Sequence, residues 1–419
     1  MVLILVDQVT ERLKYTLDFV FAERGITYSL TTGEQGFISS EEIKLNYSKN
    51  NSTGICPSEL LFEEGIRNYT IDNKMFEGQE CLSLNSIIDP LAAIFYVLSR
   101  YEEYGDQPKD EHGRFPFASS CLNSYKLISK AVCDRWANGI LKFLEIEITE
   151  RNRNVNIIPT FDIDNTYAYK LKTGSRKWLA VGKDMSKLNI ERLKERKKSL
   201  KDGGDPYDTF DTIIDIASKF QSTQMFWLVG DLAEKDRNIS TDIQEHAKLI
   251  QAMDKVVNVN LHPSYASFGK SEVMKIEKLR LEKIINHEIV NSRQHFLRFE
   301  LPESFRILEN EGFTHEYSMG FAEHVGFRSG TARPHRWFDV EQNRVSQLIV
   351  HPFVYMDGTL LEYMNLNIQK SEEKIQELYN EISEYGGDFI FIWHNETIGD
   401  YGKWKGWSQV LDFTLKLKE

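Results

Sequence analysis

The sequence has few cysteines and no long apolar run. Its 419 residues hold four cysteines, all in the first third: Cys56, Cys81, Cys121 and Cys133. They lack the close paired spacing of a disulfide framework or a zinc knuckle, so we expect reduced, buried thiols. No apolar stretch approaches the roughly 20 residues that a membrane-spanning helix needs. The apolar opening, 1–6, meets Asp7 at once and is too short for a signal peptide, so we expect a cytoplasmic protein.

The chain also lacks an excess of basic residues. Its formal net charge is -12, which excludes general nucleic-acid binding through a dominant basic surface. The segment 170–201 departs from this average, with twelve Lys or Arg against three acidic residues. It is either a solvated helix or a flap that contacts an anionic glycan or membrane surface.

The order of predicted elements divides the chain in two. In 1–150 the pattern predicts a strand at 1–6, a helix at 10–23, a helix that starts at Asp89-Pro90 and another at 127–144. We expect these to form a small N-terminal α/β domain. From about 155 to 419, short apolar strands alternate with helices, which favours a parallel sheet, open or closed into a barrel. The predicted strands there are 157–161, 224–229, 256–261, 296–299 and 389–393.

Four of these strands lie next to acidic or histidine side chains. Asp162 and Asp164 follow the first, and their i, i+2 spacing turns both carboxylates to one face, where either a cation between them or one carboxylate turned aside as a base would relieve their repulsion. His262 and His394 follow two other strands, and His295 lies in the stretch 292–299. Sites in parallel α/β folds collect at the carboxyl ends of strands. Each signal alone also fits a turn, a helix cap or a structural histidine. Four such signals, in order along the chain, indicate a functional site.

The segment around His295 carries a second basic group. If 292–299 is extended, alternation places Arg293, His295 and Leu297 on one face of the strand.

This series resembles the polysaccharide deacetylase family. The family opens with Thr-Phe-Asp-Asp-Gly, and 160–164 reads Thr-Phe-Asp-Ile-Asp, with one spacer inserted. Its next strand is similar to 224–230, its histidine-bearing strand to 260–262, its Arg-Pro-Tyr motif to 326–331, and its closing hydrophobic-His motif to 392–394. The stretch 95–103 resembles the uncharacterised domain that precedes such deacetylases in bacterial polysaccharide gene clusters. The resemblance implies a deformed (β/α) barrel over 155–419.

Carried over residue by residue, the resemblance implies roles for five side chains. Asp162 would be the general base, His394 the general acid, and Arg328 the partner of Asp162. Asp164 and His262 would be ligands of a divalent metal ion; the mixed carboxylate and imidazole set favours zinc, and other first-row divalent ions fit it as well.

The chain departs from the family at the second histidine ligand. The expected histidine four residues after His262 is Ala266 here, and the tyrosine of the Arg-Pro-Tyr motif is missing. We hypothesise that His295 supplies the third ligand, with His351 and His324 as weaker candidates. If none reaches the metal, the site is degenerate.

Three further residues are predicted to bind substrate. Trp393 and Trp407 (with Trp404 between them) flank the last motif and would stack on a sugar ring, although core packing explains them equally well. Asp357 would line the cleft, but an Asp-Gly turn explains it as well.

The predicted function is metal-dependent removal of an N- or O-acetyl group from a glycan or a sugar intermediate, with an acetylated sugar or polysaccharide precursor as substrate. Two alternatives stay open. One is hydrolysis of a non-sugar C–N bond on the same barrel, which releases no acetate. The other is a non-catalytic carbohydrate-binding or assembly protein that has lost the metal, as Ala266 would allow.

Overall fold

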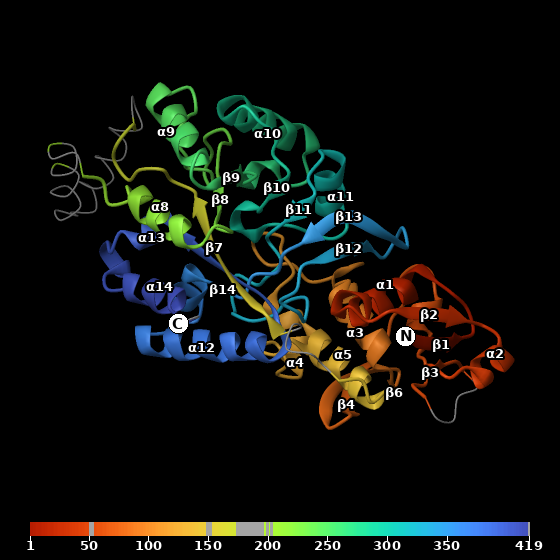
Figure 1. Cartoon of the computed structure of the whole chain (residues 1–419). Coiled ribbons are helices and arrows are strands. Elements are labelled where there is room, and N and C mark those ends of the chain that lie inside the picture. Colours follow the sequence, from red (N-terminus) through yellow and green to blue (C-terminus); the bar gives the residue numbers. More distant parts are fainter. Residues whose placement is uncertain (50–53, 148–152, 173–196, 198–200, 202–203, 418–419) are drawn as a thin grey trace.

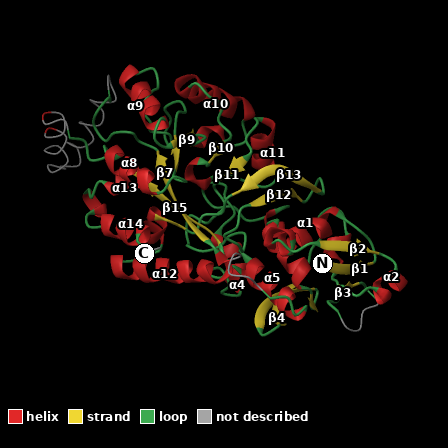
Figure 2. Ribbon diagram, in the orientation of Figure 1, coloured by secondary structure: helices red, strands yellow, loops and turns green. Residues whose placement is uncertain are grey.

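The computed structural model describes the chain except for residues 50–53, 148–152, 173–196, 198–200, 202–203 and 418–419. Most of the basic segment 170–201 lies outside the described residues. An N-terminal region, red to yellow in Figure 1, packs against a larger α/β region that runs to the C-terminus. Figure 2 shows helices on the outside of the larger region, around its strands. The α/β class predicted from the sequence is confirmed.

The N-terminal region holds two small sheets. One is parallel, in the order β2 (Tyr28–Thr31), β1 (Val2–Val6), β3 (Ile43–Tyr47). The other is antiparallel, in the order β4 (Ile71–Phe76), β5 (Gln79–Leu84), β6 (Ile87–Ile88). The longer helices are α1 (Glu11–Val20), α3 (Pro90–Leu98) and α5 (Val132–Phe143), and the shorter are α2 (Glu34–Ser39) and α4 (Cys121–Ser124).

Side-chain caps set two of these helices. Thr10 accepts a hydrogen bond from Leu13 N at the start of α1, and Asp89 accepts one from Ala92 N at the start of α3. Every residue of α3 is buried, so this helix forms the centre of the N-terminal region. The helix predicted at 127–144 begins only at Val132.

The larger region is built on one sheet of nine strands. Its order is β12 (His335–Asp339), β13 (Arg344–Val350), β11 (His315–Glu316), β10 (Asn291–Ser292), β9 (Asn258–Leu261), β8 (Gln224–Trp227), β7 (Val155–Ile163), β15 (Gly387–His394), β14 (Tyr355–Met356). All neighbours are parallel except β12 and β13. The helices among the described residues of this region are α8 (Phe210–Lys219), α9 (Gln244–Asp254), α10 (Ser271–Ile285), α11 (Glu303–Asn310), α12 (Ile368–Tyr385), α13 (Asn395–Ile398) and α14 (Ser408–Leu415).

The sheet curls so that one face is enclosed. The ring of Phe226 on β8 lies 5.2 Å from that of Tyr317, which follows β11, although β9 and β10 stand between these strands in the sheet order. Strands β12 and β14 are its two edges, so the deformed barrel is an open, curled sheet in the described part of the chain.

Alternation along the strands separates the inside of the curl from the helix-covered outside. On β15, Ile390 and Ile392 pack inside with Phe226, whereas Phe389 and Trp393 belong to the outer core. His394 is two residues beyond Ile392 and therefore continues the inward row. This alternation directs the side chains at the carboxyl ends of β7 and β15 into the open end of the curled sheet.

The stretch predicted as a strand at 296–299 is not extended. Strand β10 ends at Ser292, and His295–Leu297 forms a single 3-10 turn. The prediction that Arg293, His295 and Leu297 share one face of a strand is therefore wrong, because the chain turns at the open end of the curled sheet.

Candidate metal centre and active site

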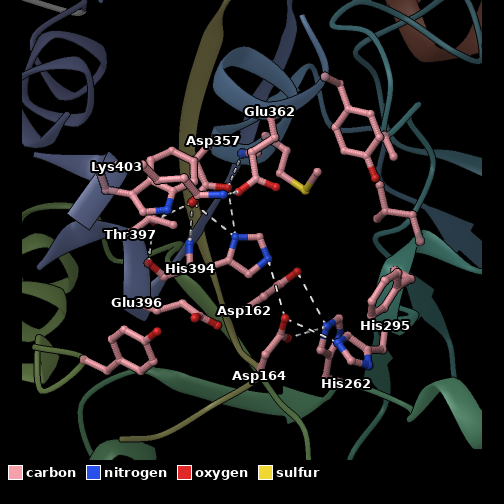
Figure 3. Close-up of a pocket in the computed structure, with 18 of the residues that line it drawn as sticks. Asp162, Asp164, His262, His295, Asp357, Glu362, His394, Glu396, Thr397 and Lys403 are labelled. Carbon is pink, nitrogen blue, oxygen red and sulfur yellow. Dashed lines mark hydrogen bonds and ion pairs between the residues drawn. The ribbon is translucent and has the colours of Figure 1, made fainter. Parts of the chain in front are cut away.

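A cavity of about 640 Å³ opens at the carboxyl ends of the parallel strands. It is lined by Asp162 and Asp164 from β7, His262 after β9, His295 after β10, and His394 at the end of β15. The four strand-associated signals of the sequence therefore meet in one place (Figure 3).

Asp164, His262 and His295 form a group that could hold a metal ion. Their ligand atoms all lie within 4.8 Å of one another. His262 Nε2 lies 3.2 Å from one carboxylate oxygen of Asp164, and His295 Nε2 lies 3.3 Å from the other. Two imidazoles and one carboxylate give three protein ligands, the number typical of a catalytic zinc site with one open position.

The surroundings of both histidines fit this role. His262 Nδ1 lies 2.5 Å from the carbonyl oxygen of Arg293, and His295 Nδ1 lies 3.0 Å from Asp236 Oδ1. An imidazole that donates Nδ1–H to an oxygen keeps Nε2 free to bind a metal, and such partners are usual around metal ligands. Asp164 Oδ1 is buried and accepts no hydrogen bond from any described residue, so it can also accept a cation.

The alternative third ligands lie elsewhere. His351 Nε2 lies 2.8 Å from His315 Nδ1, and the ring of His324 stacks on Phe117 with the centroids 4.4 Å apart. At the position of the missing family histidine, Ala266 N donates to Asp236 Oδ2 at 3.1 Å. The backbone there helps to hold the aspartate that orients His295.

Asp162 has a buried arginine partner, but it is not the predicted one. Arg293 Nη1 donates to Asp162 Oδ1 at 2.9 Å and to Thr160 Oγ1 at 2.8 Å. This leaves Asp162 Oδ2 on the side of the metal-ligand group, 3.8 Å from His262 Nε2.

The prediction that Arg328 pairs with Asp162 is therefore wrong. Arg328 forms a two-pronged pair with Glu103 of the N-terminal region, at 2.9 and 2.6 Å, and donates to Gly320 O. Arg100 also donates to Glu103, at 2.7 Å. The motif at 95–103 and the segment 326–331 thus meet in a buried ion-pair network between the two regions.

His394 stands across Asp164 from the two ligand histidines, with its Nε2 3.9 Å from Asp164 Oδ2 (Figure 3). Its Nδ1 lies 2.9 Å from Asp357 Oδ1. Asp357 Oδ2 accepts further hydrogen bonds from His394 N at 2.9 Å and Thr397 Oγ1 at 2.5 Å. Asp357, predicted to line the cleft and bind substrate, does belong to the cavity wall, but it is fully buried there and fixes the orientation of His394.

Opposite charges in this buried group shift several pKa values. Burial opposes a charge on Asp164, yet His295 and His262 lower its pKa well below the usual range. Burial likewise opposes a charge on His295 and His394. Asp164 and Asp236 nevertheless raise the pKa of His295 to about 9, and Asp357 and Asp164 raise that of His394 well above its usual value. Asp164 is therefore ionised at neutral pH, as a metal ligand must be, whereas His295 is protonated there and would release its Nε2 proton when a metal ion binds.

The predicted tryptophans do not line the cavity. Trp393 is fully buried in the outer core, where its Nε1 donates to Tyr355 Oη at 3.4 Å, because its position on β15 faces away from the curl. Trp407 packs edge-on against Trp404, and Trp404 is the tryptophan that lines the cavity. Stacking by Trp393 or Trp407 on a sugar is thus ruled out by position.

Sequence reasoning missed three residues of the site. Asp236 lies in a polar loop that gives no signal, and the pairing of Arg293 with Asp162 joins two distant segments. Glu396 lines the cavity two residues after His394 and points toward its interior (Figure 3). An acidic residue just beyond a strand-ending histidine is the signal that would have identified it.

Residues 2–148 match DUF7033, a family of unknown function. A search of curated proteins finds no match. Within the described residues, every helix is too short or too polar to cross a membrane.

Among solved structures, the chain is similar to a protein from Mycobacterium smegmatis assigned as a polysaccharide deacetylase, at 12% identity and a TM-score of 0.41, over 63% of this chain and 85% of that one. A protein from Pseudomonas aeruginosa with the same assignment has 10% identity and a TM-score of 0.38, over 66% and 89% of the two chains. A polysaccharide deacetylase from Bacillus cereus has 9% identity and a TM-score of 0.30, over 62% and 85%.

Proposed function

We propose that this protein is a metal-dependent hydrolase that removes an N- or O-linked acetyl group from a glycan or a sugar intermediate. One observation carries the proposal: Asp164, His262 and His295 converge, with Asp162 beside them and His394 across Asp164. This is the set that metal-assisted acyl hydrolysis needs, namely three ligands, a base and an acid. The convergence of His295 also counts against a binding protein with a degenerate site.

The side chains divide the work of hydrolysis between them. A divalent ion held by Asp164, His262 and His295 would polarise the acetyl carbonyl and acidify water. Asp162, with Oδ1 bonded to Arg293, accepts the proton of the attacking water on Oδ2. His394 then gives a proton from Nε2 to the departing amine or alkoxide, while Asp357 holds Nδ1 and stabilises the imidazolium.

The cavity suits a sugar. Trp404 and Tyr207 offer faces on which a sugar ring can pack, and Glu396 and Glu362 offer acceptors for hydroxyl groups. We propose a cytoplasmic, acetylated sugar or polysaccharide precursor as substrate and zinc as the metal.

The test is elemental analysis combined with acetate release from N- and O-acetylated sugars. The parent is expected to bind about one metal ion and release acetate. Asp164→Ala and His295→Ala are expected to lose both. Asp162→Asn is the matched variant: it keeps the metal, because Asp162 is not a ligand, and loses at least about 100-fold in kcat.

Each alternative gives a different result. A metal-bound parent that hydrolyses cyclic amides and releases no acetate from sugars would favour the non-sugar hydrolase. A parent that takes up no added zinc would refute the metal-dependent mechanism.

A further inference from the structure

The turn that presents His295 has an unfavourable backbone conformation. Phe296 and Leu297 both adopt positive φ, at 63° and 53°. For bulky non-glycine residues this left-handed region is disfavoured and persists only where surrounding contacts impose it. The direction of His295 Nε2 therefore depends on whatever holds this turn.

A segment of the N-terminal region, residues 109–114, holds it. Arg114 Nη1 donates to the carbonyl oxygen of Phe296 at 2.9 Å. The ring of His112 packs edge-on against that of Phe296, with the centroids 5.0 Å apart. Arg114 and His112 are both buried. Residues of the N-terminal region thus contact both the backbone carbonyl and the side chain of Phe296.

Hydrogen bonds to Asp110 fix the conformation of the segment 109–114. Asp110 Oδ1 accepts hydrogen bonds from the backbone N–H groups of His112 and Arg114, both at 2.9 Å. Asp110 Oδ2 accepts from Arg114 Nε at 2.7 Å. One carboxylate therefore closes the segment and aims the guanidinium at Phe296.

The larger region holds the same segment from its own side. Arg298 Nε donates to His112 O at 2.6 Å, and its Nη1 donates to Tyr265 O at 3.1 Å. Tyr265 N in turn donates at 2.7 Å to Asp236 Oδ1, the atom that faces His295 Nδ1. Segment 109–114, the strained turn and the aspartate behind His295 thus form one continuous network.

We propose that Arg114 is a positioning residue for His295, and that the N-terminal region is part of the catalytic unit through it. Arg114 fixes the Phe296 carbonyl, which keeps the turn in its left-handed conformation and His295 Nε2 directed at Asp164. The catalytic consequence rests on the proposed function, whereas the structural one does not.

The experiment compares Arg114→Ala and Arg114→Lys with the parent in the full chain. The control is Arg67→Ala, which removes an exposed arginine of the same region that pairs with Glu63. Zinc affinity is measured by competition with a chromophoric chelator. Hydrogen exchange is measured in the metal-free protein on the peptide that covers 294–298, where Leu297 N bonds to Gln294 O and Arg298 N to His295 O.

Arg114→Ala is expected to bind zinc about 10- to 100-fold more weakly and to exchange faster at 294–298, with far-UV circular dichroism unchanged. Arg114→Lys has a single donor nitrogen in place of the two that bond separately to Asp110 Oδ2 and to Phe296 O, so its values should lie between those of Arg114→Ala and the parent. Arg67→Ala should match the parent in both measurements.

The hydrogen-exchange measurement distinguishes failure of the positioning role from failure of the proposed function. A parent that binds no zinc would refute the metal mechanism, and faster exchange in Arg114→Ala would still support the positioning role. A folded Arg114→Ala with parental exchange at 294–298, or with parental zinc affinity, would overturn the positioning role.

Discussion

Replacing Arg293 by Met should destabilise the protein by about 3–5 kcal/mol, because it leaves Asp162 buried without its cation. Asp162 is 3% exposed and Arg293 is fully buried. Arg293 makes one ion-paired hydrogen bond, to Asp162, of about 1.5–3 kcal/mol, and its charged guanidinium donates two more to the uncharged acceptors Thr160 Oγ1 and Tyr317 O. The methionine stem keeps part of the packing on the Phe226 ring, over which the guanidinium lies at 4.4 Å.

The assay is urea-induced unfolding at pH 7 with a chelator present, so that no metal ion compensates for the lost charge. Arg293→Met is compared with Asp162→Asn and with the double variant. Adding Asp162→Asn to Arg293→Met should restore at least about 2 kcal/mol, because it removes the unpaired charge. A loss below about 1 kcal/mol in Arg293→Met, or additive effects in the double variant, would refute the assignment of Arg293 as the partner of Asp162.

Three other changes have defined outcomes. Asp357→Asn should lower kcat about 100-fold or more and leave KM nearly unchanged in acetate-release kinetics, because it misorients His394; an unchanged kcat would contradict that role. Asp236→Asn should weaken zinc binding about tenfold in a chelator competition, and parental affinity would show that His295 needs no such support. Burial lowers the pKa of His246 from 6.5 to about 4, so its contribution is intact above pH 6.5 and is lost as the pH falls toward 4. The free energy of unfolding, measured by urea titration, should therefore fall by about 3 kcal/mol over this pH range in the parent, and this fall should be absent in His246→Gln. An equal pH dependence of the free energy of unfolding in the two proteins would disprove the assignment.

Local signals in the sequence predicted much of the framework. Thr10 and Asp89 mark helix starts because their side chains bond to the backbone a turn ahead, within the same segment. Asp162, Asp164 and His394 were predicted because they follow apolar strands, and sites in parallel α/β folds collect at the carboxyl ends of the strands.

The remaining parts of the site depend on contacts between distant segments. Arg293 and Arg328 are both arginines beyond apolar stretches, and only the fold shows that one meets Asp162 and the other Glu103. His295 was predicted on a strand, whereas it lies on a turn whose Phe296 carbonyl accepts a hydrogen bond from Arg114 of the N-terminal region. The domain division at about 150 stays a prediction.

The sheet order has a consequence for how the chain is made. Strand β7 is synthesised first among the strands of the large sheet and pairs along its length with β15, the last of them in sequence. Until β15 leaves the ribosome, one edge of β7 offers unpaired backbone groups to other chains. Asp162 and His394 lie opposite each other in this late pairing, so a nascent chain carries the proposed base long before the proposed acid. The last strand both protects the edge and completes the proposed site, so dependence on chaperones should end, and hydrolytic activity should begin, at the same point of synthesis.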